Sequence, residues 1–78
     1  MKYVYILESE RGSHFYVGVT SNLKARVRLH NAGKVNHTAK HAPWKIRTYI
    51  AFSDGDRTME FERYLKSGSG RAFAEKRF

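Results

Sequence analysis

The sequence predicts a small α+β domain in which a three-stranded antiparallel sheet is flanked by helices, in the order β-β-α-β-α-α. Two short runs rich in β-branched and aromatic residues lie on either side of a polar turn near the start of the chain, and a third run follows at 44–52. Capping residues and helical spacing mark the intervals after the second and third runs. The length of 78 residues predicts one domain, residues 1–78.

The first two strands form a hairpin. Residues 3–7 are aromatic, β-branched or aliphatic and predict a buried strand, and the polar residues 8–13 carry turn chemistry. Residues 14–19 form the second strand. Gly18 lies inside it, where a glycine marks either a bulge or a place where another group approaches the backbone closely.

Three residues that favour the N-cap position stand in a row before the first helix: Thr20, Ser21 and Asn22. The helix extends to about Ala32, and Gly33 suits the left-handed position that follows a helix. Arg26 and His30 are four residues apart, so they project from adjacent turns of one face.

Residues 34–42 are polar and basic and predict a loop that ends at Pro43. The third strand, 44–52, begins with Trp44 and ends with Phe52, and both aromatic side chains are expected in the core.

A second helix is predicted over 56–66, with Asp54 or Asp56 as its N-cap and Gly68 as its end. Ser69 is the expected cap of a last short helix that continues to the final residue of the sequence. Helices are needed because a three-stranded sheet has two faces to bury.

The charge is strongly basic and unevenly placed. Fifteen Lys and Arg against seven Asp and Glu give a net charge of +8 and a pI near 10.1. From Glu10 to Asp54 no other carboxylate occurs, and this segment holds all four histidines. Such a segment is expected for contact with a phosphate backbone, although a solvated basic face kept for solubility is the simpler alternative. The candidate phosphate contacts in this segment are Lys24, Arg28, Lys34 and Lys40.

Composition excludes several classes. The absence of cysteine removes disulfide frameworks and thiolate zinc sites. No apolar run approaches the roughly 20 residues of a membrane span, so neither a membrane anchor nor a membrane partner is expected. We therefore expect a cytoplasmic domain. The histidines show no tight metal-ligand spacing, and no glycine-rich phosphate loop precedes a helix.

The remaining chemistry-bearing residues follow a recognisable order. Tyr3-Val4-Tyr5 precedes Tyr16-Val17-Gly18, Arg26 and His30 come next, and Glu62 lies on the second predicted helix. Over nearly the whole chain this arrangement resembles the GIY-YIG nuclease superfamily. It is most similar to the small stand-alone bacterial members, in a superfamily that also contains the N-terminal nuclease half of a DNA-repair excinuclease.

The resemblance implies a metal-dependent endonuclease that hydrolyses DNA phosphodiesters with one Mg²⁺ or Mn²⁺ ion. The catalytic residues it implies are Tyr5, Tyr16, Arg26, His30 and Glu62. Glu62 is also the implied metal carboxylate, and Gly18 stands behind the second tyrosine among the substrate-binding residues. Several family members have an asparagine about twelve residues after the glutamate, where this chain has Ala74.

These residue types suit the implied chemistry. A single carboxylate suits Mg²⁺, which keeps most of its waters. The Arg26 guanidinium forms a planar, charged fork to a phosphate. A tyrosine is a weak base at its ordinary pKa of about 10, so we hypothesise that Tyr5 or Tyr16 relays the proton of water to a neutral His30.

Each assignment has a simpler structural alternative. The tyrosines suit a packing pair, His30 a surface or cap histidine, and Glu62 an exposed helical ion pair with Lys66. Two other functions stay open: a catalytically silent nucleic-acid-binding module, and a nuclease subunit active only with a protein partner. The small size of the chain suggests branched or damaged DNA as the substrate.

Overall fold

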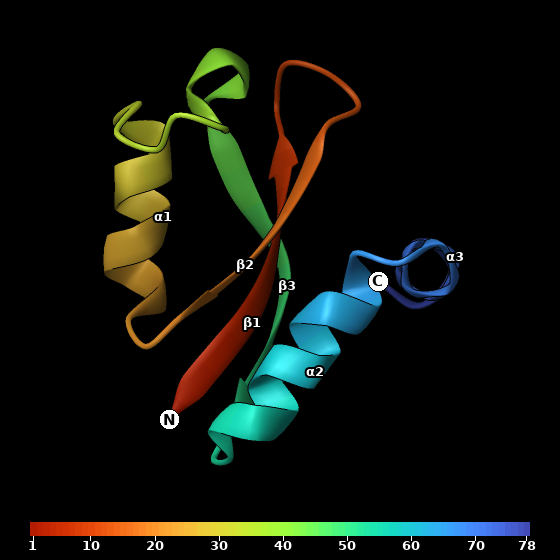
Figure 1. Cartoon of the computed structure of the whole chain (residues 1–78). Helices are drawn as coiled ribbons and strands as arrows, with labels where there is room; N and C mark the ends of the chain where they lie inside the picture. The colour runs from red at the N-terminus through yellow and green to blue at the C-terminus, as the bar shows by residue number, and fades with distance from the viewer.

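The central strand of the sheet is the first in sequence. The computed structural model describes residues 1–78 and shows three antiparallel strands in the order β2-β1-β3, which confirms the predicted α+β class and element order. The elements are β1 (Lys2–Ser9), β2 (Phe15–Thr20), α1 (Leu23–Asn31), a single 3₁₀ turn (Ala39–His41), β3 (Trp44–Phe52), α2 (Gly55–Leu65) and α3 (Gly68–Arg77) (Figure 1).

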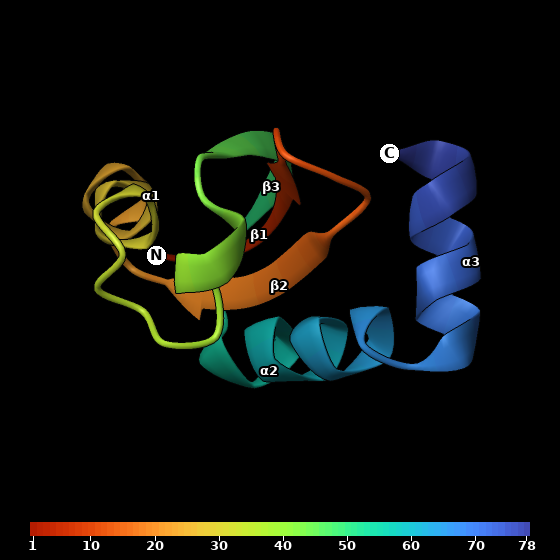
Figure 2. The same ribbon diagram turned by 90° about the horizontal axis from the view of Figure 1, so that it is seen from above.

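Helices cover both faces of this sheet. α1 lies on one face and α2 on the other, and α3 lies beyond the end of α2, far from α1 (Figure 2). Four consecutive side chains of β1, from Val4 to Leu7, are at most 4% exposed. Because successive side chains of a strand point to opposite faces, this run contributes to both cores, and it is therefore continuously apolar rather than alternating.

Alternate residues of β1 belong to two different cores, one on each face of the sheet. Val4 and Ile6 pack against Leu65 of α2, and the partly buried side chains around them are Val17, Val19, Phe52, Phe61, Ala74 and Phe78. Tyr5 and Leu7 pack with Trp44 on the α1 face, surrounded by Tyr16, Leu23, Val27 and Ala42. The α2 face is thus an aliphatic and aromatic core, whereas the α1 face contains tyrosines.

Gly18 is required by a close approach rather than by a bulge. The pairing of β1 with β2 is regular, with Tyr5 opposite Gly18, and the one irregularity lies between β1 and β3 at Ile6 and Leu7. The Tyr5 ring lies over Gly18, where a β carbon would be only 2.6 Å from Cζ of Tyr5. Of the two alternatives for this glycine, the bulge is wrong and the close approach is confirmed.

Hydrogen bonds hold the predicted loop, residues 34–42, in place, and the loop contains the 3₁₀ turn. The Asn31 side chain accepts from the backbone N–H of Trp44 at 2.5 Å and donates to its carbonyl at 3.0 Å. The indole N–H of Trp44 donates to the carbonyl of Thr38 at 2.9 Å. Gly33 has φ of 73°, the left-handed conformation expected after the helix.

The junction between α2 and α3 differs from the prediction. Asp54 is the N-cap of α2, as one of the two alternatives stated, but Gly68 is the first residue of α3 and does not end α2. Ser67, not Ser69, caps α3, because its hydroxyl oxygen accepts from the N–H of Gly70 at 3.1 Å. Gly70 is buried against the end of α2, and this contact fixes where α3 begins.

Replacement of Gly70 by alanine is expected to destabilise this junction. A β carbon there would overlap the Tyr64 carbonyl and lie 2.7 Å from Cα of Leu65, so backbone would have to move. Overpacking of this kind costs about 1–3 kcal/mol. Gly68→Ala is the matched control, because its β carbon meets nothing within 4 Å. Urea unfolding of both variants checks this, and equal stabilities would contradict the packing argument.

Candidate active site

The α1 face of the sheet holds a buried hydrogen bond between a tyrosine and a histidine. Tyr5 is 1% exposed and His30 is fully buried, although both carry polar atoms. The distance from Tyr5 Oη to His30 Nε2 is 2.9 Å. Strand β1 supplies the tyrosine and the last turn of α1 supplies the histidine, so the bond joins the sheet to the helix.

A third residue fixes the direction of this bond. Nδ1 of His30 lies 2.7 Å from Oγ1 of Thr38, and the Thr38 hydroxyl donates to the carbonyl of Val35 at 3.3 Å. Since the single hydroxyl proton of Thr38 is used there, we assign the proton on His30 to Nδ1, which donates to Thr38. Nε2 then accepts from the Tyr5 hydroxyl. The geometry therefore makes Tyr5 the donor and His30 the acceptor.

Burial keeps both groups uncharged. Removal from water lowers the pKa of His30 below its usual value, and the positive charge of Arg26 lowers it further. Burial also raises the pKa of Tyr5, and a hydrogen bond with Arg26 offsets part of this rise. Near neutral pH the pair thus consists of a phenol and a neutral imidazole.

Arg26 and Tyr16 complete a four-residue group. The Tyr16 ring centroid is 4.9 Å from that of His30 and 6.2 Å from that of Tyr5. The pKa of Arg26 is raised, mainly through a hydrogen bond with Tyr5 and also through Tyr16. Arg26 is one helical turn before His30 and partly buried. Four of the five candidate catalytic residues are therefore brought together by β1, β2 and α1.

Glu62 comes from the opposite layer. It lies on α2, the helix that runs alongside the edge strand β2 (Figure 2). Its carboxylate bonds to the Lys66 ammonium at 2.9 Å, and its side chain is 19% exposed. Its negative charge contributes to the raised pKa of Tyr5, so the carboxylate acts electrostatically on the tyrosine site from across this edge. The ion pair expected as the simpler alternative is present.

The donor groups fit only a metal ion that keeps most of its own waters. No group of three or more His, Asp or Glu side chains is arranged to hold a metal ion. Glu62 supplies one carboxylate, and Mg²⁺ is commonly held by one or two carboxylates together with water and substrate phosphate. Such an ion would replace Lys66 at the Glu62 carboxylate.

The residues proposed to contact substrate fall into two groups. Four cations are exposed on α1 and the loop after it: Lys24, Arg28, Lys34 and Lys40. Gly18, by contrast, is buried beneath Tyr5, so its contribution is to admit the tyrosine ring.

Ala74 packs against the core on the α2 face, away from the Tyr5–His30 bond.

Sequence reasoning missed Thr38. It is 1% exposed and holds the proton-bearing nitrogen of His30, yet it lies in a segment that is polar and basic throughout. No spacing rule connects a loop threonine to a helix histidine eight positions earlier. Only the path of the chain between α1 and β3 brings the two together.

None of the three helices has the length and apolar character needed to cross a bilayer.

Comparison with known proteins gives the family. The family model described as the GIY-YIG catalytic domain matches residues 1–76. A UPF0213 protein of Lacticaseibacillus paracasei is 40% identical over 65 residues, which cover 82% of this chain and 72% of that protein. A UPF0213 protein of Streptococcus pneumoniae is 34% identical over 65 residues, covering 82% and 65%.

A solved structure shows the same fold. The solution NMR structure of a UPF0213 protein from Bacillus halodurans matches with a TM-score of 0.58 and 32% identity. The match covers 96% of this chain and 81% of that one. The family match agrees with the order of elements and with the grouping of two tyrosines, an arginine and a histidine. The chain belongs to the GIY-YIG catalytic-domain family, a family of nucleases.

Proposed function

We propose that the protein is a divalent-metal-dependent endonuclease that hydrolyses DNA phosphodiester bonds. The observation that carries the proposal is the directed hydrogen bond from Tyr5 to a neutral, buried His30. Membership of a nuclease family and the cationic segment between Glu10 and Asp54 support it.

Hydrolysis needs an activated water, and the Tyr5–His30 pair provides a route for its proton. The Tyr5 hydroxyl donates to Nε2 of His30 and accepts from Arg26, so one lone pair of its oxygen remains to accept from water. As the water oxygen attacks phosphorus, its proton passes to Tyr5 and the phenolic proton passes to Nε2. Tyr5 ends the step neutral and His30 ends it as an imidazolium. The direct bond to His30 favours Tyr5 over Tyr16 as the relay.

Arg26 connects substrate binding to this proton transfer. In the free protein its charge lowers the pKa of His30. A phosphate bound by the Arg26 guanidinium would bring negative charge beside it and offset that effect. His30 therefore becomes a stronger proton acceptor when substrate is present. The same guanidinium neutralises a non-bridging oxygen of the phosphate.

Glu62 is the residue that would hold the metal ion, Mg²⁺ or Mn²⁺. Such an ion supplies stabilisation of charge on the attacked phosphate and on the leaving oxygen. The cations exposed on α1 and in the loop, among them Lys24 and Lys34, would bind the DNA backbone. The proposed substrate is branched or damaged DNA, and the proposed location of the protein is the cytoplasm.

The Glu62–Lys66 ion pair favours one competing function. The Glu62 carboxylate lies 2.9 Å from the Lys66 ammonium, which neutralises its charge. A carboxylate without a free charge suits a nucleic-acid-binding module that no longer cleaves. A nuclease subunit whose partner removes Lys66 from Glu62 is a related form. Cleavage by the purified chain separates both from the leading proposal.

Glu62→Gln is expected to lower metal-dependent nicking of supercoiled DNA at least about 100-fold, because the amide removes the charge that binds the ion. DNA affinity should change less than about twofold, since one acidic group is lost from a basic protein. Glu60→Gln, an exposed residue of the same helix, is the control. Wild-type nicking by Glu62→Gln would remove Glu62 from the site, and absence of nicking by the wild type would favour the silent module.

Replacement of each tyrosine by phenylalanine tests the relay. Tyr5→Phe should reduce the single-turnover cleavage rate by about 10²–10⁴, the range for loss of general acid–base catalysis. Tyr16→Phe should retain more activity, because no hydrogen bond links it to His30. Circular dichroism checks that both variants fold. The reverse order of activities would transfer the relay to Tyr16.

The pH profile should follow the protonation of His30. Its pKa is lowered in the folded protein, so the neutral acceptor form persists below about pH 6.5, and protonation removes it as the pH falls through the folded pKa. The acid limb of kcat/KM is therefore expected at a midpoint below about 6.5. Cleavage rates of one DNA substrate across buffers give this midpoint, and an acid limb centred above about 7 would contradict His30 as the acceptor.

A further inference from the structure

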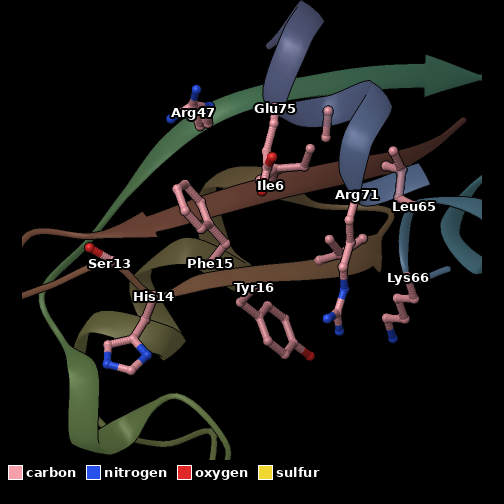
Figure 3. A pocket seen from close by; sticks show the side chains of 12 residues that line it. Ile6, Ser13, His14, Phe15, Tyr16, Arg47, Leu65, Lys66, Arg71 and Glu75 are labelled. Atoms are coloured by element: carbon pink, nitrogen blue, oxygen red, sulfur yellow. The ribbon is translucent and has the colours of Figure 1, made fainter. Parts of the chain in front are cut away.

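A cavity of about 550 Å³ lies on the α2 face, between the sheet and α3. Its apolar lining comes from the sheet and from both C-terminal helices: Val17 and Ala74 are partly buried, whereas Ile6 and Leu65 are only 4% and 2% exposed. Phe15, which is 53% exposed, adds an aromatic ring at the start of β2 (Figure 3). The volume falls within the range of pockets that hold small organic groups.

Cations predominate at the edge of this cavity. Its lining includes Arg47, Lys66 and Arg71, with Glu75 as the single carboxylate. Arg47 is held by protein groups, because its Nε donates to the Phe78 carbonyl at 2.8 Å. Arg71, by contrast, is exposed and makes no side-chain hydrogen bond or ion pair within the chain. An apolar interior with a free cation at its edge suits an occupant with a flat apolar part and a negative charge.

Two contacts join the cavity to the candidate active site. Tyr16 lines the cavity, and its ring centroid is 4.9 Å from that of His30. Lys66 also lines it, and its ammonium is bonded to the Glu62 carboxylate at 2.9 Å. The side chains of Tyr16, Lys66 and Arg71 project toward the same side of the molecule (Figure 3). A molecule seated in the cavity would thus contact Tyr16 and Lys66, which adjoin His30 and Glu62 of the candidate active site.

We propose that this cavity receives one unstacked nucleotide of the DNA strand that flanks the scissile phosphate. The base packs beside Phe15, whose ring also lies under the Arg47 guanidinium at 5.3 Å, and against the apolar walls, and its phosphate is bound by Arg71 and Lys66. A nucleotide has both required parts, since every base has a flat face that stacks on aromatic side chains and every phosphate carries charge. This inference rests on the proposed nuclease function and adds how the strand is positioned beside it.

The arrangement extends the DNA path beyond the cationic middle of the sequence. Arg71 follows Glu62 in the chain, outside the segment without carboxylates. Together with Lys66 it places positive charge at the cavity, and α3, which carries Arg71, lies far from α1 (Figure 2). A strand would then cross the edge of β2, with Arg26 on one side and Arg71 on the other.

The first test measures binding of a fluorescein-labelled single-stranded oligodeoxynucleotide by anisotropy, in EDTA so that cleavage does not occur. Arg71→Ala should weaken binding about fivefold or more and reduce the slope of log K against log salt by about 0.7, the value for one phosphate contact. Arg77→Ala is the matched control, an exposed arginine of α3 outside the cavity. Equal losses in the two variants would overturn the proposal.

The second test separates the base from the phosphate. Wild-type protein should bind the intact strand about fivefold or more tightly than a strand of the same length made of abasic residues. Phe15→Ala should lose most of this preference, whereas Phe73→Ala, a partly exposed aromatic outside the cavity, should keep it. No preference in the wild type would overturn the proposal. A free mononucleotide that binds as tightly as the strand would also overturn it and assign the cavity to small molecules.

Failure of the inference and failure of the proposed function are distinguishable. A protein that shows the Arg71 and Phe15 effects but never nicks DNA with Mg²⁺ or Mn²⁺ would retain the nucleotide cavity without the nuclease activity. An active nuclease in which Arg71→Ala behaves like Arg77→Ala would retain the activity and exclude the cavity from strand binding.

Discussion

The buried chain of hydrogen bonds from Tyr5 through His30 to Thr38 connects the parts of this fold. Three polar side chains, each at most 1% exposed, satisfy one another in the interior of the protein. Loss of any partner would leave a buried polar atom unpaired at a cost of about 1–3 kcal/mol. These hydrogen bonds link the central strand β1 to α1, and α1 to the loop before β3. Gly18 makes the arrangement possible because a larger residue would occupy the space of the Tyr5 ring.

The two faces of the sheet serve different purposes. On the α2 face, Val4 and Ile6 meet aliphatic and aromatic side chains, and this apolar core stabilises the domain. On the α1 face, the same strand contributes Tyr5 to a polar network. A 78-residue chain has little apolar surface to spare. Because both faces of β1 are buried, one strand contributes to the apolar core on the α2 face and to the candidate active site on the α1 face. The close contact of Gly70 with α2 keeps α3 at the edge of the α2-face core.

Charge is distributed so that a carboxylate and a histidine remain usable in a basic protein. Lys66 neutralises Glu62, and burial with Arg26 nearby keeps His30 neutral. In the proposed function both arrangements would respond to a ligand: a metal ion would compete with Lys66, and a bound phosphate would offset the charge of Arg26. Each ligand would replace or screen a charge that is already present in the free protein.

Local pattern in the sequence was enough to predict the α+β class, the element order, the left-handed Gly33 and the grouping of Arg26 with His30, since these depend on residue spacing and backbone preference. Sequence did not place the start of α3, because Ser67 and Ser69 are equally good caps and only the packing of Gly70 against α2 selects one. Likewise, the partner of His30 at Thr38 and the cavity beside α3 depend on residues far apart in the chain. Local spacing carries no information about such contacts, which the packing of helices on the two faces of the sheet decides.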